Sequence, residues 1–388
     1  MRRCLARTAS GVRGSQQLGW TATDREEFDP MLGNDVFVFD NVVHMYDTSE
    51  DNLVDAASII DRNGQLKRAG KRRGTPKTLP PAANSTGIGD GYDRRWNVEE
   101  LGDLLFADGL TDMAMAQAVV LFDVYKDGFA PVQAQYDFAQ AFPDKVLFCG
   151  GVDPMFPGKA GAKADMTRQV EQMGARSFKF YNGHVDDSSW RCDDKELAYP
   201  IYEHALELGI EVIQFHKGNP ITRAPLDTLT PLDIERAARD FPELTFGIHH
   251  LALPYFEECV YIAQRNPNVV LVLSGTMHLP LIAPWRFQRY LGRLLRDVGA
   301  DRLLWGSEAP LLGNPRPAIE WFWNMDMPEE LQDRYGFPQV TESDKRLILG
   351  LNQARLFDVR PPTEAFKGVK AQFLPDDMML TGTPTPSR

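Results

Sequence analysis

Runs of apolar, often β-branched residues alternate with amphipathic segments along most of this chain, and this alternation limits the possible folds. The runs predict eight strands, at 36–43, 116–122, 146–151, 176–181, 211–216, 244–249, 268–274 and 302–307. Helical patterns lie between them, for example at 128–142, 196–208 and 284–298. Eight strands that alternate with helices favour a distorted (β/α)8 TIM barrel over an open doubly wound sheet. No glycine-rich phosphate-binding motif follows the first strand, which weakens the nucleotide-binding alternatives.

Four of these runs end at a side chain that can coordinate a metal. His44 follows the first run, His216 ends the fifth, His249 and His250 end the sixth, and Glu308 follows the last. The carboxyl ends of the strands carry the active site in barrels of this kind, so we expect these residues to meet there. Imidazole and carboxylate groups also move protons, which makes His250 and Glu308 candidate catalytic residues as well as candidate ligands.

Alternation along a strand indicates which of these side chains face the barrel interior. Residues two apart point the same way, so Asp40, Val42 and His44 are expected to share the inner face. His249 and His250 are adjacent, so only one is expected to reach the site while the other packs toward a helix. We predict that His250 reaches it, because it is nearer the loop. The simpler alternatives are a histidine that is only hydrogen-bonded and a carboxylate in a rim salt bridge.

Two cations in and after the fourth run are further candidates. Lys179 lies between aromatic residues in SFKFY, where an unpaired charge is costly to bury. Three roles are open for it: binding a substrate carboxylate, pairing with Glu308, or carrying a carbamate that bridges two metals. Arg191, in SSWRCDD, is either a clamp for an anionic substrate or part of a loop salt bridge with Asp193 or Asp194.

Composition excludes several classes of protein. The net charge of −12 over 388 residues argues against nucleic-acid binding, because phosphate contacts need clustered lysine and arginine. No apolar stretch approaches the roughly 20 residues that span a bilayer, which argues against a membrane protein. The four cysteines show no paired spacing, so we predict no disulfide framework and a cytoplasmic location.

Several stretches fall outside a minimal barrel. We predict an N-terminal extension at 1–35, a barrel at 36–358 with an insertion at 48–96, and a C-terminal tail at 359–388 that is loose or wraps a neighbour. A second long loop, 309–341, follows the last strand. Loops after strands lie on the catalytic face, so the insertion and this loop are expected to wall the pocket or to contact a partner subunit.

Eight blocks of sequence between residues 36 and 358 carry a family resemblance. They are FVFDNVVH, VLFCGGVDP, ARSFKFYNG, ELGIEVIQFHKG, FPELTFGIHHLALPYFEE, PNVVLVLSGT, DRLLWGSEAP and ILGLNQARLF. In this order they resemble the amidohydrolase-related metal-dependent barrels, in the branch with aminocarboxymuconate semialdehyde decarboxylase and aromatic acid decarboxylases. The resemblance implies one divalent metal, often zinc, held by a strand-one His-x-His pair, a strand-five histidine and a strand-eight aspartate. A strand-six histidine then assists proton transfer.

This chain departs from the family pattern at two ligands. Val42 stands where the first histidine of the pair is expected, so only His44 remains of that pair. Glu308 replaces the strand-eight aspartate, whereas His216 and His250 match. The loss of one imidazole weakens a mononuclear zinc site of the usual kind, which has three or four protein ligands.

Three arrangements of the site are open. In the first, His44, His216, Glu308 and water hold one metal. In the second, another carboxylate, from a carbamylated Lys179 or from Asp47, completes a mononuclear or dinuclear site that favours iron or manganese. In the third, the site is degenerate and the chain is a structural subunit of a heteromer.

A further resemblance concerns the opening FDNVVHMYD and the block WGSEAPL. Both are similar to chains of the two-component 2-aminoisobutyrate hydroxylase, in which two amidohydrolase-like subunits assemble and a metal site activates dioxygen. This resemblance implies monooxygenation of a small amino acid, with iron or manganese as the metal and a homologous barrel as the partner.

The leading prediction is a metal-dependent hydrolase or non-oxidative decarboxylase that acts on a small carboxylate. The metal polarises water or substrate, His250 or Glu308 moves the proton, and Arg191 or Lys179 anchors the substrate carboxylate. Zinc is the metal expected for this enzyme. The alternatives are an oxygen-activating hydroxylase, or a subunit of one, and a scaffold subunit with a degenerate metal site. We expect a homo-oligomer or a heteromer with a homologous barrel.

Overall fold

The computed structural model describes residues 35–72 and 94–379, without the side chains of 66–72, 377 and 379. Almost all of the predicted N-terminal extension, the middle of the predicted insertion and the last nine residues of the predicted tail (380–388) therefore lie outside the described residues. None of the described helices is long and apolar enough to cross a membrane.

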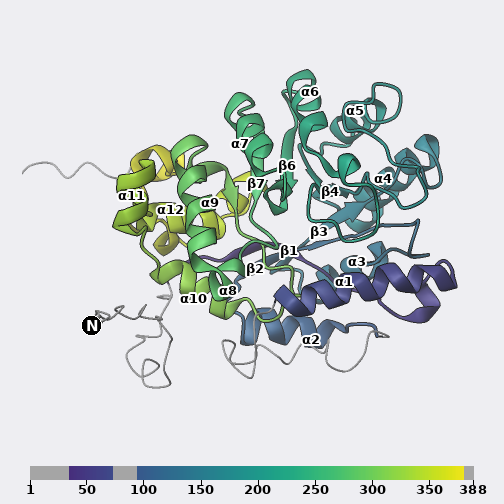
Figure 1. Ribbon diagram of the computed structural model, residues 1–388, viewed down its shortest axis with the longest axis horizontal. Helices are drawn as coiled ribbons and strands as arrows, with labels where there is room; N and C mark the ends of the chain where they lie inside the picture. Colours follow the sequence, from purple (N-terminus) through teal and green to yellow (C-terminus); the bar gives the residue numbers. More distant parts are fainter. Residues whose placement is uncertain (1–34, 73–93, 380–388) are drawn as a thin grey trace, which may run out of the picture. The chain divides into compact units, whose positions relative to one another are not determined.

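Eight parallel strands form one sheet whose order follows the sequence, which confirms the predicted (β/α)8 barrel (Figure 1). The strands are β1 Phe39–Val43, β2 Met113–Gln117, β3 Val146–Gly151, β4 Ser177–Phe180, β5 Val212–Phe215, β6 Thr245–His249, β7 Val269–Val272 and β8 Leu303–Leu304. The helices between strands are α1 Ile59–Arg72, α2 Val98–Gly102, α3 Val132–Ala141, α4 Lys159–Met173, α5 Tyr199–Glu207, α6 Leu232–Asp240, α7 Phe256–Arg265, α8 Leu279–Ile282 and α9 Pro284–Asp297. After β8 come α10 Arg316–Asn324, α11 Glu329–Tyr335, α12 Glu342–Arg346, α13 Asn352–Leu356 and α14 Asp376–Met379.

Alternation along the strands separates an apolar outer face from a polar interior. On β4, Phe180 packs outward against Tyr202 of α5, with 6.4 Å between ring centroids, and stacks on Phe215 of β5. Lys179 points to the opposite side, where its Nζ contacts His249 of β6. Burial of the aromatic layer between sheet and helices stabilises the barrel and fixes which side chains enter its interior.

Two predicted strands have different boundaries in the structure. The second run was expected at 116–122, but β2 begins earlier, at Met113, because Met113 pairs with Phe39. Beyond Gln117 the chain leaves the sheet, and Leu121 adopts a positive φ of 42°. The last run, expected at 302–307, forms only a two-residue strand, since the residues after Leu304 pair with β1 through separate hydrogen bonds.

Closure of the barrel brings the first and last strands together at the site. The backbone amide of Glu308 donates to the Val42 carbonyl (2.9 Å), and the amide of His44 donates to the Ala309 carbonyl (2.9 Å). These bonds join the segment after β8 to the end of β1. As a result, Glu308 and His44, which are far apart in the sequence, become neighbours.

A bulge in β1 changes which of its side chains face inward. Asp40 pairs with Ala114 and Val43 with Ala116, so β1 carries one residue more than its partner over this stretch. Both Asn41 and Val42 consequently contact the interior. Asn41 donates to Gln214, and Val42 packs in a cluster with Val270, Val272 and Leu304.

Residues 359–379 pack on the C-terminal helices of the chain, so this part of the predicted tail is not loose. Ala365 and Val369 are buried, and Lys370 Nζ lies 3.5 Å from an Asp344 carboxylate oxygen in α12. The apolar residues of this Pro-rich stretch, spaced among polar ones, bury themselves against the C-terminal helices.

A buried ionic cluster fixes the loops that follow β2, β3 and β4. His184 Nε2 lies 2.7 Å from Asp153 Oδ2, and its Nδ1 lies 2.9 Å from Ser188 Oγ. Ser188 Oγ donates its own proton to Asp186, so His184 donates from both ring nitrogens and is an imidazolium. Burial opposes this charge, but the hydrogen bond and charge of Asp153, helped by Asp123, raise the pKa of His184 to about 9.

This cluster predicts a loss of stability at alkaline pH. The pKa of His184 is higher in the folded chain than in the unfolded one, so its stabilisation is complete below pH 6.5 and is lost as pH rises through about 9. We expect the stabilisation contributed by His184, measured by urea unfolding as the difference between the wild type and His184→Gln, to be about 3 kcal/mol larger at pH 6 than at pH 9.5. The difference removes contributions common to both proteins, such as that of Lys179, whose lowered pKa acts in the opposite direction. His204→Gln, on α5, should have the pH profile of the wild type. An unchanged pH profile for His184→Gln would contradict the assignment.

Candidate metal centre

Four predicted site residues converge at the carboxyl ends of the barrel strands. His44 Nε2 lies 3.6 Å from Glu308 Oε2, and His250 Nδ1 lies 3.5 Å from Glu308 Oε1. His250 Nε2 lies 3.0 Å from His216 Nδ1. The structure therefore brings together side chains from the ends of β1, β5, β6 and β8, as the strand-end pattern predicted.

Backbone carbonyls determine the protonation of two of these imidazoles. His216 Nε2 donates to the Asn219 carbonyl (3.1 Å), so Nδ1 carries the lone pair. His250 Nδ1 lies 3.0 Å from the Ser274 carbonyl, and donation there leaves the lone pair on Nε2. His250 Nε2 and His216 Nδ1 lie 3.0 Å apart, so either a proton on one of them, which makes that ring an imidazolium, or a cation is required beside them.

His44 is oriented in the same manner. Its Nδ1 lies 2.6 Å from the Gln117 carbonyl in β2 and donates to it, so Nε2 faces Glu308. Nε2 donates to the carboxylate when it carries a proton and can bind a metal when it does not. A metal-binding histidine usually donates its other ring N–H to a backbone carbonyl, a carboxylate or water, as His44 Nδ1 does here.

Glu308 supplies the negative charge of the site. The Oε1 atom is buried and accepts no hydrogen bond from the described residues. Burial opposes ionisation, but the charge of His250, the hydrogen bond with His44 and the charge of Lys179 hold the pKa of Glu308 well below its usual range. A buried, ionised carboxylate beside imidazole lone pairs fits a divalent cation, since N and O ligands of this kind suit zinc, iron and manganese.

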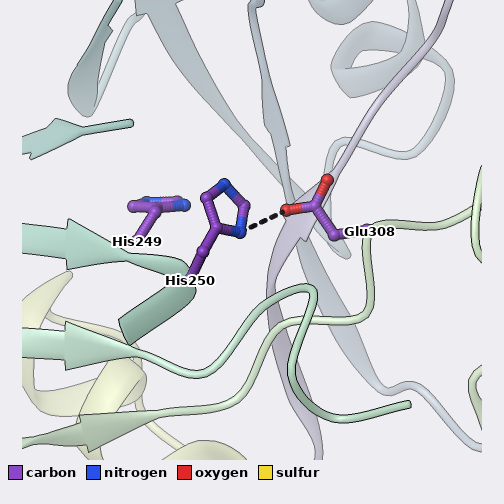
Figure 2. Close-up of side chains that lie close together, drawn as sticks. All are labelled: His249, His250 and Glu308. Carbon is purple, nitrogen blue, oxygen red and sulfur yellow. Dashed lines mark ion pairs between the residues drawn. The ribbon is translucent and has the colours of Figure 1, made fainter. Parts of the chain in front are cut away.

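His249 also enters the site, so the expectation that it packs toward a helix is wrong. Its ligand nitrogen, one from His250 and a Glu308 oxygen all lie within 4.8 Å of one another (Figure 2). β6 ends at His249 with the side chain inward, and the next three residues, His250, Leu251 and Ala252, have φ values of 59°, 51° and 47°. Strand alternation does not continue through this left-handed turn, so both imidazoles face the interior.

Lys179 lies one layer below the site. Its Nζ is 2.6 Å from His249 Nδ1, while His249 Nε2 donates to Gln214 Oε1 (2.9 Å). Burial lowers the pKa of Lys179 to about 7, although the charge of Glu308 opposes this shift. Lys179 is not among the described residues that line the cavity at the site. Lys179 therefore contacts His249 and does not line the cavity.

Two other predicted residues lie elsewhere. Arg191 pairs with Asp193 (2.8 Å) and does not line the cavity, so the loop salt bridge is the alternative that the structure contains. Asp47 pairs with Arg95 (2.7 Å) and accepts from Ser49, and it too is not among the cavity-lining residues. Each of these two side chains is paired with an opposite charge outside the cavity.

Val42, which stands in place of an expected ligand, is part of apolar packing. It forms a cluster with Val270, Val272 and Leu304 inside the barrel. It also lies so close to Gly306 that a Cβ there would be 2.8 Å from Val42 Cγ2. An apolar side chain therefore fills the space between β1 and the segment after β8 at this position.

A small cavity of about 50 Å³ opens beside these residues. The two long loops contribute to its wall, as predicted, through Gln65 of α1 and through Leu311 and Leu312 after β8. Sequence reasoning missed Tyr46 and Tyr181, which also line it. Their spacing of two from His44 and Lys179 was an available signal, whereas nothing in the sequence pointed to Gln65.

Comparison with known proteins gives the family. A family model described as "Amidohydrolase" matches residues 98–359. The chain belongs to the amidohydrolase family. This chain is also 25% identical over 217 residues to protein fluG of Emericella nidulans, and the match covers 51% of the chain. It spans only 24% of the length of that curated relative.

Solved structures agree with the amidohydrolase fold. An uncharacterised TIM-barrel protein from Bordetella bronchiseptica is 19% identical with a TM-score of 0.60, covering 85% of this chain and 99% of its own. 5-Carboxyvanillate decarboxylase from Novosphingobium aromaticivorans, solved with bound manganese, is 15% identical with a TM-score of 0.52. That match covers 84% of this chain and 99% of the decarboxylase chain. A probable 2-pyrone-4,6-dicarboxylic acid hydrolase from Acinetobacter baumannii is 13% identical with a TM-score of 0.51, and the match covers 83% of this chain and 99% of the hydrolase chain.

Proposed function

We propose that this amidohydrolase is a metal-dependent hydrolase or non-oxidative decarboxylase of a small carboxylate. The observation that carries the proposal is the convergence of the His44, His216 and His250 ring nitrogens on the buried carboxylate of Glu308 beside a cavity. Proteins of similar fold include a decarboxylase solved with manganese and a probable dicarboxylic acid hydrolase, in agreement with this assignment.

His44, His216 and Glu308 are the proposed ligands, through His44 Nε2, His216 Nδ1 and the Glu308 carboxylate. A divalent metal, zinc first and manganese second, would supply a Lewis acid that polarises water or a substrate carbonyl. The set has three protein ligands, the number usual for catalytic zinc.

His250 is the proposed proton-transfer residue. Its Nε2 can accept a proton in the cavity, and the imidazolium that results lies with Nδ1 3.5 Å from the Glu308 carboxylate. The Ser274 carbonyl, 3.0 Å from Nδ1, holds the ring in place during this transfer. An oriented imidazole of this type typically contributes about 10²–10⁴-fold to the rate.

The proposed metal is the only cation available to bind a substrate carboxylate among the groups that line the described cavity. The described cavity lining contains no lysine or arginine side chain, since Arg191 lies elsewhere and Lys179 lies beneath His249. In the absence of a cation, Glu308 would repel a substrate carboxylate. We therefore expect carboxylate binding to require the metal.

Metal content tests this proposal. Elemental analysis of the purified protein should give one zinc or manganese ion per chain, and dialysis against a chelator should remove both the metal and carboxylate binding. His216→Ala should lose the ion and all turnover, whereas His204→Ala on α5 should behave as the wild type. A wild-type protein without stoichiometric metal would overturn the assignment.

A dioxygen-activating hydroxylase is a second candidate, favoured by a group of three potential ligands. His249, His250 and Glu308 place two imidazoles and one carboxylate within 4.8 Å, the donor types of non-haem iron oxygenases. His249 would bind through Nδ1 in place of its contact with Lys179. This candidate predicts bound iron, oxygen consumption with a small amino acid, and a homologous barrel that co-purifies. Full activity under anaerobic conditions would exclude it.

A further inference from the structure

One buried amide of the cavity wall has a donor that no described residue accepts. Gln65 of α1 is 3% exposed and lines the same cavity as the candidate metal ligands. Its Oε1 accepts a hydrogen bond from the Tyr125 hydroxyl (2.6 Å), which leaves Nε2 as the available donor. Nε2 is buried and has no hydrogen-bond partner among the described residues. Leaving such a group unsatisfied costs about 1–3 kcal/mol, so a partner in the cavity is expected.

α1 holds this donor in a fixed position. Asp61, four residues before Gln65, accepts from both the backbone amide and the guanidinium of Arg223, each at 2.9 Å. Arg62 donates to the Thr48 carbonyl (3.2 Å). A donor on a helix that is tied down on both sides is preorganised, so a ligand does not have to immobilise it.

Gln65 is separated from the candidate metal ligands by a series of aromatic rings. Tyr125, its partner, stacks on Phe129 (5.0 Å between centroids), and Phe129 contacts Tyr46 (4.5 Å), which in turn contacts His44 (5.0 Å). A ligand that reaches both ends therefore needs two polar groups with an apolar part between them that lies against these rings.

We infer that Gln65 is the specificity-determining residue that reads the end of the substrate opposite the metal-bound carboxylate. Because its amide oxygen is already occupied by Tyr125, Gln65 offers only a donor, and it selects an oxygen acceptor such as a hydroxyl or carbonyl. It discriminates against a methyl group, which leaves Nε2 unsatisfied, and against an ammonium group, which has no acceptor. This inference rests on the proposed function, in which the metal holds the substrate carboxylate.

Three probes of equal chain length test it: 3-hydroxypropionate, butyrate and β-alanine, which end in a hydroxyl, a methyl and an ammonium group. Calorimetric titration of the manganese-loaded protein should show 3-hydroxypropionate bound about tenfold more tightly than the other two. Gln65→Met should reduce this preference to within about twofold. Gln65→Glu, which keeps an acceptor for Tyr125, should shift the preference to β-alanine. Gln172→Met, on the exposed surface of α4, is the matched control and should bind like the wild type.

The outcomes separate this inference from the proposed function. Metal content should be unchanged in both Gln65 variants, because Gln65 is not a ligand. Metal-dependent binding of all three probes with equal affinity, unaltered in Gln65→Met, would overturn the role of Gln65 and leave the metal site intact. Binding that needs no metal, or no binding of any probe, would overturn the proposed function and this inference with it.

Discussion

Glu308→Gln is expected to abolish metal binding and to lower kcat by about 10²–10³-fold. The substitution keeps the size of the side chain but removes the negative charge that faces His44 and His250. The new amide nitrogen also donates toward the His44 Nε2 lone pair and blocks it as a ligand. Zinc titration by calorimetry, together with elemental analysis, measures the first effect, and turnover measures the second.

Glu308→Asp is the matched control for this experiment. Aspartate keeps the charge and is the residue that the family resemblance implied at this position. We expect it to retain one metal ion per chain with reduced turnover, because the shorter side chain moves the carboxylate away from His44 and His250. A full equivalent of metal in Glu308→Gln would remove Glu308 from the ligand set.

Lys179→Met is expected to raise the free energy of unfolding by about 1–4 kcal/mol at pH 7 while lowering activity about 10–100-fold. The ammonium group is fully buried, and burial is what lowers the pKa of Lys179 to about 7. Methionine fills a similar volume without that penalty. Activity falls because Lys179 orients His249 and helps to keep Glu308 ionised. Urea unfolding and steady-state kinetics measure the two effects.

A second buried lysine provides the contrast. Lys217 is also fully buried, but it pairs with Asp233 at 2.8 Å. Lys217→Met leaves that buried carboxylate unpaired and should destabilise the chain by about 3–5 kcal/mol. Metal content decides the carbamate hypothesis for Lys179: we expect Lys179→Met to keep its ion, because Nζ contacts His249 rather than the cavity. Loss of the ion would show that Lys179 is a ligand.

Local sequence patterns were enough to predict much of the candidate site. A barrel strand is apolar until it reaches the catalytic face, so His216 and Glu308 are visible in the sequence as the residues where apolar runs stop. His249 was misjudged because alternation holds only while the chain remains extended, and the left-handed turn after it follows no simple residue pattern. For Arg191 the sequence left two roles open, and the structure contains the loop salt bridge, with Asp193 as the partner.

The sequence by itself determined the (β/α)8 fold and most of the candidate ligands, because strand periodicity and the residue at each strand end are local properties. Only the tertiary structure decided how those ligands are used. Barrel closure placed Glu308 beside His44, a helix in the insertion brought Gln65 into the cavity, and strand register put Lys179 against His249. Such contacts join residues that are distant in the chain, and their existence depends on how the helices and strands pack rather than on any local pattern.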